Sequence, residues 1–400
     1  MTAWLLVAAA LVTTVVLTLR HPDALVTLLP SPDMHELHVD FDTFRFSAVA
    51  LAQGGDIYAT PAKLPNLNPP LLSVLLLPFA GLDALTGYRI FAALMLLTTL
   101  VSLLAVAREL RLRPVVQVGA ALAVLASSPL HGTLVLGQIY PLLLAAMVAG
   151  WIAERRGRPV PAAVLYGVAV ALKPSLAPVL LLPAVQLRWS ALRAGIASAA
   201  VATLVGVLAA GPSSAFAWLH LALDQVAPEV PDNASLPGLV ARFGLPSTLG
   251  TALGAAVLVG TLAWCGYHRD RVDPAGTAPW AVLAAGLLLA PIAWHNYLML
   301  LWPGVLVLVA LGRGSAAAAA LAVAVVPVSW AAEWPPESVG PAVSAVAGSL
   351  YCAILLGYWF LLLSSARGSS SSPRGDEPFS GRSDGRQPVE VGPSDGRVPG

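Results

Sequence analysis

The chain has 400 residues, of which 57% are hydrophobic and only 11% are charged. Soluble domains carry about 25% charged residues, so this chain has too few polar side chains to cover a water-facing surface, and lipid is its natural solvent. The formal net charge of +1 argues against nucleic acid as a partner, because that needs a clustered basic face.

Apolar runs recur along the whole chain and predict an all-α, polytopic transmembrane bundle. A spanning helix needs about 20 apolar residues. The first run lacks a basic leader and a clear cleavage site, so we expect a first span there rather than a signal peptide. The fifth and sixth runs are short enough for half-helices. The twelve expected spans are 3–19, 88–107, 114–130, 134–153, 160–172, 175–187, 194–210, 247–266, 278–293, 297–312, 315–331 and 340–363.

Lys and Arg residues in the short connections predict the orientation, because cytoplasmic loops carry an excess of them. Placing the clusters at 108–113 and 155–158 inside puts sixteen of the 22 Lys and Arg residues in the cytoplasm. Both termini are then cytoplasmic, and the connection at 20–87 is a long first extracytoplasmic loop. Residues 1–363 form the predicted membrane domain. Residues 364–400 are rich in Ser, Gly, Pro and Arg and predict a disordered cytoplasmic tail.

Residues 68–82 (NPPLLSVLLLPFAGL) are apolar enough to enter the membrane. Counting them as a full span would move the arginines at 108–113 outside. The prolines at 69, 70 and 78 break helices. We therefore expect a re-entrant or juxtamembrane hairpin that returns to the outer face.

The first loop carries two closely spaced acids, Asp40 and Asp42. Residues 43–52 mix apolar side chains with Arg45, which predicts a helix lying along the membrane interface. Asp42 is then expected to be its N-cap. One alternative is that both acids only cap and solvate this helix.

Other polar residues adjoin the apolar runs at the predicted outer ends. Lys173 interrupts an apolar stretch, and a lysine at such depth is a functional candidate, although a lysine also snorkels to the interface. Cations at this depth suit a phosphate, and a carboxylate suits the deprotonation of a hydroxyl. His295 follows Trp294, where a histidine is also common beside an aromatic belt. The remaining candidates are Gln138, Tyr140, Asn233 and Arg242.

Polar and proline-containing motifs follow one another along the chain: VDFDTF (39–44), GGDIY (54–58), NPPL (68–71), GQIYPLLL (137–144), YGVAVALKP (166–174), NASLPGLVAR (233–242) and PIAWH (291–295). In this order they resemble motifs of one family, the actinobacterial polyprenol-phosphate-mannose-dependent α-mannosyltransferases (glycosyltransferase family 87). The likeness covers about residues 1–360. Where the family's Gly-Gln segment usually continues with Asn, this chain has Tyr140.

This resemblance implies a glycosyltransferase of the GT-C type in the plasma membrane, with its active site on the extracytoplasmic face. It implies inverting transfer of a hexose, usually mannose, from a polyprenyl-phosphate donor to an envelope glycolipid or glycan. By the same implication Asp40 is the general base, with Asp42 the next candidate. Lys173, Arg242 and His295 hold the donor phosphate, and Gln138, Tyr140 and Asn233 lie at the sugar.

The sequence has no metal-ligand cluster at recognisable spacing, and the two cysteines, Cys265 and Cys352, lie in apolar runs. We therefore expect neither a metal nor a cofactor. Three alternatives stay open at this point: an enzyme that uses another lipid-linked sugar, a transporter or flippase of lipid-linked sugars, and a non-catalytic scaffold. Transporters commonly show internal repeats and midplane polar groups, whereas here the charges gather at the outer face.

Overall fold

The computed structural model describes residues 2–21 and 38–367. Within these ranges the regular structure is helical, apart from two isolated β-bridges, Asn233–Trp294 and Val272–Arg367. This confirms the all-α prediction. The predicted disordered tail lies almost wholly outside the described residues, as does the 22–37 part of the first loop.

Four helices are long and apolar enough to cross a membrane, or up to six if each of two bent pairs counts as one span. The bent pairs are α6–α7 and α19–α20, with angles of 52° and 44°. The other predicted spans are shorter or broken helices, so the count of twelve stays a prediction. The four long helices are α1 (Thr2–Arg20), α5 (Ala84–Glu109), α11 (Trp189–Ala210) and α14 (Ser247–Tyr267).

The predicted span at 134–153 is wrong as a continuous helix. Helix α6 (Pro114–Leu125) is followed by α7 (Ser128–Leu136) and α8 (Tyr140–Arg155). Gly137 ends α7 in the left-handed conformation, with φ of 74°, which glycine adopts without steric cost. Pro141 then stands in the first turn of α8, where its missing N–H costs nothing.

A second break lies at Lys173 and agrees with the predicted pair of short spans. Helix α9 (Pro159–Leu172) is followed by the 3₁₀ helix η2 (Pro174–Leu180) and by α10 (Leu181–Val185). Because the residue before a proline is pushed out of the α region, Pro174 ends α9. Lys173 is accordingly extended, at φ −144° and ψ 90°.

The C-terminal third surrounds one central helix, α15 (Ala278–Leu289), which is buried on every side as an all-apolar helix requires. The predicted span at 315–331 is wrong as one helix, because α17 ends at Val323 and Pro327 precedes a separate 3₁₀ turn. The remaining elements are η3 (His295–Leu301), α16 (Trp302–Ala310), α17 (Gly314–Val323), η4 (Val328–Glu333), α18 (Pro336–Val339), α19 (Pro341–Ala347) and α20 (Leu350–Ser364).

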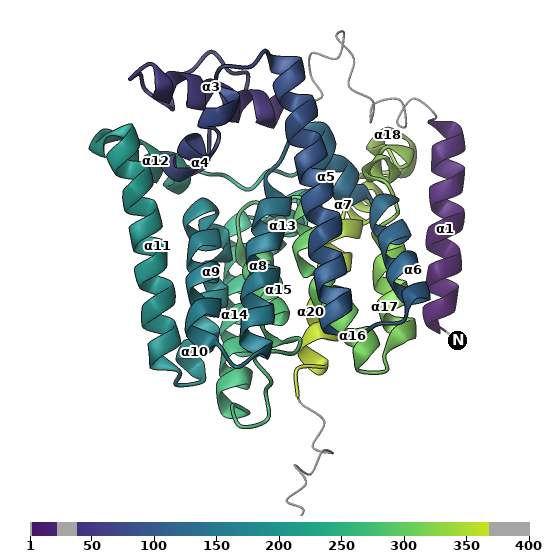
Figure 1. Cartoon of the computed structure of the whole chain (residues 1–400). Helices are drawn as coiled ribbons and strands as arrows, with labels where there is room; N and C mark the ends of the chain where they lie inside the picture. Colours follow the sequence, from purple (N-terminus) through teal and green to yellow (C-terminus); the bar gives the residue numbers. More distant parts are fainter. Residues whose placement is uncertain (1, 22–37, 368–400) are drawn as a thin grey trace, which may run out of the picture. The chain divides into compact units, whose positions relative to one another are not determined.

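Short helices gather at one end of the long ones, where α3 lies across them (Figure 1). A helix is present where an interfacial helix was predicted at 43–52, but it begins earlier, and Asp42 is not its N-cap. Its place at the membrane interface stays a prediction. His38 holds that position, and the Asp42 amide already donates to the His38 carbonyl at 2.9 Å. The elements at this end include α3 (Val39–Ala52), α4 (Pro70–Leu75), η1 (Leu77–Phe79), α12 (Pro212–Leu223) and α13 (Leu236–Arg242).

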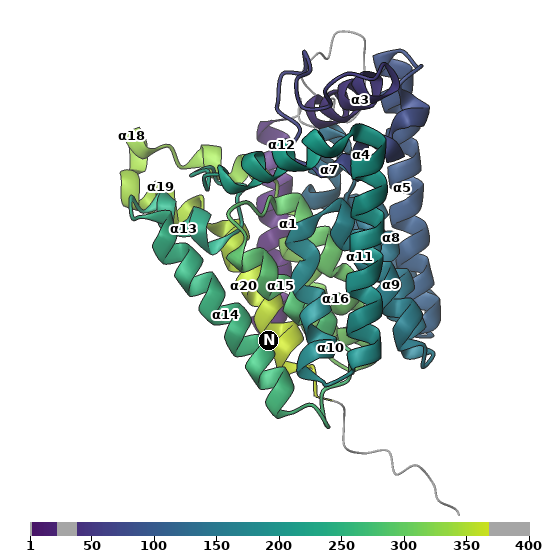
Figure 2. The ribbon, with the colours of Figure 1, turned by 90° about the vertical axis from the view of Figure 1, so that its left-hand side faces the viewer.

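Residues 68–82 form no full helical span, since α4 has six residues and η1 has three. Pro69 precedes α4 and Pro78 lies in η1, as expected of helix breakers. Helix α4 lies beside α3 at the same end of the bundle (Figures 1 and 2). The described residues 68–82 thus make no full span, and the re-entrant or juxtamembrane hairpin stays a prediction.

The opposite end of the described bundle holds the arginine clusters. Arg156 pairs with Glu109 at 2.9 Å, which joins the ends of α8 and α5. Arg188, which precedes α11, pairs with Glu154. Arg313 donates to Ser365 Oγ at 2.8 Å. The clusters that predict the orientation therefore share one end of the bundle.

Candidate active site

Asp40 lies in the first turn of α3, half-buried, and its carboxylate is held by one amide. Gln138 Nε2 donates to Asp40 Oδ2 at 2.6 Å, and the Gln138 side chain is itself buried. Burial raises the pKa of Asp40 above its ordinary value, while the Gln138 hydrogen bond and the charge of Lys173 act to lower it. Gln138 and Lys173 thus stabilise the charged form of a carboxylate that is partly shielded from water.

Gly137 allows the α7–α8 break to meet α3 directly. A Cβ atom at this position would stand 2.4 Å from Cβ of Phe41, the neighbour of Asp40. Real Cβ atoms essentially never come so close. The missing side chain therefore lets Gln138, the next residue, reach Asp40.

Asp42 serves a different contact. Its Oδ2 lies 2.9 Å from His38 Nδ1, one helical turn earlier, and the His38 ring packs 4.8 Å from the Tyr88 ring. The hydrogen bond and charge of Asp42 raise the pKa of His38 despite burial. Asp42 thus anchors the start of α3, whereas Asp40 is hydrogen-bonded to Gln138. Asp40 is the better candidate for a base.

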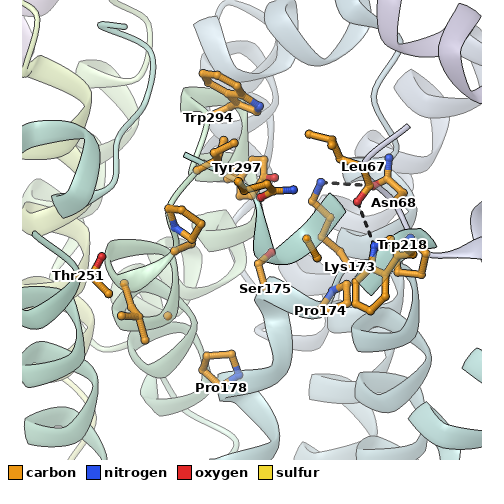
Figure 3. Close-up of a pocket in the computed structure, with 18 residues that line it drawn as sticks. Leu67, Asn68, Lys173, Pro174, Ser175, Pro178, Trp218, Thr251, Trp294 and Tyr297 are labelled. Atoms are coloured by element: carbon orange, nitrogen blue, oxygen red, sulfur yellow. Dashed lines mark hydrogen bonds between the residues drawn. The ribbon is translucent and has the colours of Figure 1, made fainter. Parts of the chain in front are cut away.

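Lys173 projects from the break after α9 and is held by an amide and two aromatic rings. Its Nζ donates to Asn68 Oδ1 at 3.4 Å (Figure 3). The same atom lies 5.4 Å from the ring centroid of Tyr297 and 5.9 Å from that of Tyr140. The two rings pack together at 4.5 Å. Ring faces attract a cation, so this cage positions the ammonium group within the protein.

A cavity of about 490 Å³ opens at Lys173 (Figure 3). Polar groups, among them Asn68, Gln225 and Trp294, line it together with many apolar side chains. A pocket with a few polar groups in an apolar lining is the usual form of a small-molecule site. The apolar part of the lining includes Leu67, Pro178, Leu289, Ala290 and Ile292.

Asn68 is a site residue that sequence reasoning did not single out. Its amide N–H donates to Asn66 Oδ1 at 3.0 Å, and its carbonyl accepts from Tyr58 at 3.0 Å. Asn66 in turn donates to Ser47 of α3 at 3.0 Å. The loop after α3 is thereby tied to that helix and delivers Asn68 to Lys173. The signal in the sequence was the motif at 54–58 and 68–71, which forms this loop.

Asn233 uses its whole amide to hold the segment before η3. Nδ2 donates to the carbonyls of Pro228 and Pro291, both at 3.1 Å. Oδ1 accepts from the amides of Ala293 at 3.0 Å and Ser235 at 3.2 Å. Among the described residues, these four bonds occupy the side chain. Asn233 therefore positions the 291–294 segment, which carries Trp294 at the cavity.

Arg242 and His295 join Asn233 in a second cluster. Arg242 Nη1 donates to the carbonyls of Val230 at 2.8 Å and Asn233 at 2.9 Å, and among the described residues Arg242 Nη2 has no hydrogen-bond partner. The His295 ring is buried, 3.8 Å from Asp232, and fills the space that Gly132 leaves. Contact of Arg242 and His295 with the donor phosphate stays a prediction.

Asn296 is a further residue that sequence reasoning did not assign. It is fully buried, and neither its side-chain oxygen nor its nitrogen has a hydrogen-bond partner within the described ranges. It stands next to Tyr297, which lines the cavity. Unsatisfied buried amides are rare and call for a specific explanation, such as a bound water or ligand.

Comparison with known proteins shows the family to which the chain belongs. The model of glycosyltransferase family 87 matches residues 66–291, more than half of the chain. The match includes Gln138, Lys173 and Arg242, and it lies between Asp40 and His295 in the sequence. The chain is also similar to two proteins named polyprenol-phosphate-mannose-dependent alpha-(1-2)-phosphatidylinositol mannoside mannosyltransferase.

The relative from Mycobacterium tuberculosis strain H37Rv is 29% identical over 306 residues, 68% of this chain and 70% of the relative. The relative from Mycolicibacterium smegmatis is 26% identical over 315 residues, 68% of this chain and 69% of the relative. The family match confirms the resemblance seen in the motifs. The chain belongs to glycosyltransferase family 87 and is a glycosyltransferase.

Proposed function

We propose that the protein transfers a hexose, with mannose the first choice, from a polyprenyl-phosphate donor to a hydroxyl of an envelope glycolipid or glycan. Transfer takes place at the outer face of the plasma membrane and inverts the anomeric centre. Both similar proteins are named for a polyprenol-phosphate-mannose donor and a phosphatidylinositol mannoside acceptor. The observation that carries the proposal is the placing of Lys173 at the cavity, against the ring of Tyr140, while Gln138, two residues before Tyr140, is hydrogen-bonded to Asp40.

In this mechanism Asp40 removes the proton of the acceptor hydroxyl while its oxygen attacks the anomeric carbon. A C–O bond to the acceptor forms, and the bond between the anomeric carbon and the phosphate oxygen breaks. The polyprenyl phosphate leaves with the bonding electrons, and Asp40 keeps the proton. One carboxylate suffices for such an inverting displacement, whereas retention through a covalent intermediate needs a second carboxyl close by.

Lys173 binds the phosphate and stabilises its departure. The donor phosphate is a diester with one negative charge, and the leaving monoester gains further charge. A fixed cation therefore interacts more strongly with the transition state than with the bound donor, which is the condition for catalysis. Asn68 and the two tyrosine rings hold the ammonium group in advance of the reaction.

The other candidate residues have different roles in this proposal: some bind the sugar, one positions a segment, and two are assigned to the donor phosphate. Gln138 is hydrogen-bonded to Asp40 and the Tyr140 ring lies near Lys173, so both are assigned to the sugar. Asn233 acts through the segment that carries Trp294. Arg242 offers its Nη2, which has no hydrogen-bond partner within the described ranges, and His295 offers its buried ring.

The test is a transfer assay with purified protein in nanodiscs, labelled polyprenyl-phosphate mannose and phosphatidylinositol mannoside. Asp40→Asn is expected to lower the rate about 10²- to 10⁴-fold with donor binding retained, because a positioned base contributes that much. Asp42→Asn is the matched control and is expected to keep most of the activity. Lys173→Met is expected to weaken donor binding.

Two results would contradict parts of this proposal. Full activity of Asp40→Asn would remove that residue from the role of base and make Asp42 the next candidate. Transfer from a glucose or arabinose carrier but not from the mannose carrier would keep the reaction class and change the donor.

A further inference from the structure

Helix α12 runs in a different direction from the helix before it. Gly211, at φ 87°, separates α11 from α12, and this left-handed value suits glycine. Figure 2 shows α11 along the bundle and α12 across its end, near α3 and α4. The orientation is that of a helix in the plane of a membrane surface.

One face of α12 is apolar and exposed. Phe216 is 66% exposed, Leu219 46% and Leu223 74%. The spacing i, i+3, i+7 puts these three side chains on one side of the helix. Val226, just beyond the helix, is 78% exposed and continues the apolar series. We call Phe216, Leu219 and Leu223 the outer stripe.

The outer stripe continues the lipid-facing surface of a spanning helix. Helix α11 is long and apolar enough to cross the membrane, and little of it is buried within the protein. Leu204 is 52% exposed on it, and Leu208, in its last turn, 70%. The chain passes from this surface through Gly211 directly into α12. Lipid of the same bilayer is therefore the natural occupant of the outer stripe.

The other sides of α12 meet water and the cavity. Exposed Ser213, His220 and Asp224 lie along one edge of the outer stripe, with His220 one turn after Phe216. Trp218 and Ala222 line the cavity that opens at Lys173, and Trp218 Nε1 donates to the Leu67 carbonyl at 3.2 Å (Figure 3). A helix with an apolar side, a polar side and a protein side is typical of the membrane interface.

We infer that α12 lies in the membrane interface at the α3 end of the bundle, with the outer stripe among acyl chains. One helix then separates the lipid of this leaflet from the cavity. This placement of α12 holds whichever sugar the enzyme transfers.

The test uses single cysteines with a nitroxide label in nanodiscs and power-saturation measurements. Cys265 and Cys352 are buried, so the native thiols do not react in the folded protein. Labels at 216, 219 and 223 are expected to collide with oxygen rather than with a water-soluble nickel complex, at a depth of about 5–10 Å. Labels at 213 and 224 serve as water-facing controls, and a label at 222 as the inner-face control.

Two outcomes would overturn the inference. Nickel accessibility at 216, 219 and 223 equal to that at 224 would place the outer stripe in water. Shielding of these positions from both relaxants, to the level seen at 222, would show that a second copy or another protein covers the stripe. Neither result depends on transfer activity, so a failed transfer assay leaves this test intact.

Discussion

At the scale of single residues, two opposing influences decide the protonation of Asp40. Partial burial raises its pKa, whereas Gln138 and Lys173 stabilise the carboxylate. A general base works best when its pKa lies near the operating pH. The raised pKa makes Asp40 more basic than an exposed aspartate, and Gln138 limits how far this goes.

The first residue-scale prediction concerns pH. Gln138→Leu removes a hydrogen bond that favours the charged form, so the pKa of Asp40 is expected to rise further. Because the base acts only when deprotonated, activity is lost as pH falls through this pKa. The acid limb of kcat/KM is therefore expected at higher pH in the variant than in the wild type. The measurement is a rate profile from about pH 5 to pH 9.

Gln117→Leu is the matched control for this profile. Gln117 donates to the Leu112 carbonyl at the start of α6, and its loss is expected to leave the acid limb unmoved. Coincident acid limbs for Gln138→Leu and the wild type would disprove the coupling to Asp40.

A second residue-scale prediction compares two buried asparagines. Asn296 has no hydrogen-bond partner among the described residues, so Asn296→Leu is expected to keep or raise thermal stability. Asn233 makes four hydrogen bonds, so Asn233→Leu leaves buried groups unpaired and costs about 1–3 kcal/mol for each. Thermal unfolding in detergent measures both. If Asn296→Leu were as unstable as Asn233→Leu, the Asn296 side chain would have to make hydrogen bonds that stabilise the fold.

At the scale of elements, two of the candidate site residues, Lys173 and Gln138, lie where helices break. Lys173 follows α9 at a proline, and Gln138 lies in the gap between α7 and α8. Irregular backbone at membrane depth is tolerated only where protein or a cavity surrounds it. The breaks therefore mark where the bundle accommodates polar groups, and they place Lys173 at the cavity.

The element-scale prediction uses two glycines with the same backbone conformation. Gly137 and Gly54 have φ of 74° and 72°, so alanine is strained at both. Only at Gly137 would the new Cβ clash, at 2.4 Å from Phe41 Cβ, while Gly54 faces open space. Gly137→Ala is expected to displace α3 and lower transfer by at least about tenfold, because small displacements at a site are costly. Gly54→Ala is expected to stay within about twofold of the wild type.

Transfer rates and folded yield are measured side by side for this pair. A Gly137→Ala enzyme as active as Gly54→Ala would show that α3 does not depend on close approach to the α7–α8 break. Equal losses in both variants would trace the effect to backbone strain rather than to the contact.

At the scale of the whole molecule, the arginine clusters at one end predict which end faces the cytoplasm. Cysteine at position 83, beside α3, is expected to react with a membrane-impermeant maleimide in intact cells. Cysteines at 156 and 313 are expected to react only after permeabilisation. Labelling of position 156 from outside would reverse the orientation and move the site to the inner face.

Sequence patterns predicted much of this architecture. Long apolar runs predicted spans at 3–19, 88–107, 194–210 and 247–266, and the structure has helices at 2–20, 84–109, 189–210 and 247–267. Such runs become helices because a helix makes its backbone hydrogen bonds within the segment, as lipid requires. Pro174 made the break at Lys173 predictable. The N-cap at Asp42 and the continuous spans at 134–153 and 315–331 were wrong. These predictions used hydropathy or residue type, whereas the backbone geometry at glycine and proline residues and at the start of α3 determined where each helix begins and ends.

The sequence by itself determined the solvent of the chain, its helical class and the residue types of the site, because these depend on local composition and spacing. Only the tertiary structure decided which side chains meet. Gln138 reaches Asp40 across 98 residues, and Asn68 reaches Lys173 across 105. Such contacts depend on how helix breaks and loops pack against each other. Gly137 is an example, because its missing side chain lets α3 approach closely. No local pattern encodes that approach.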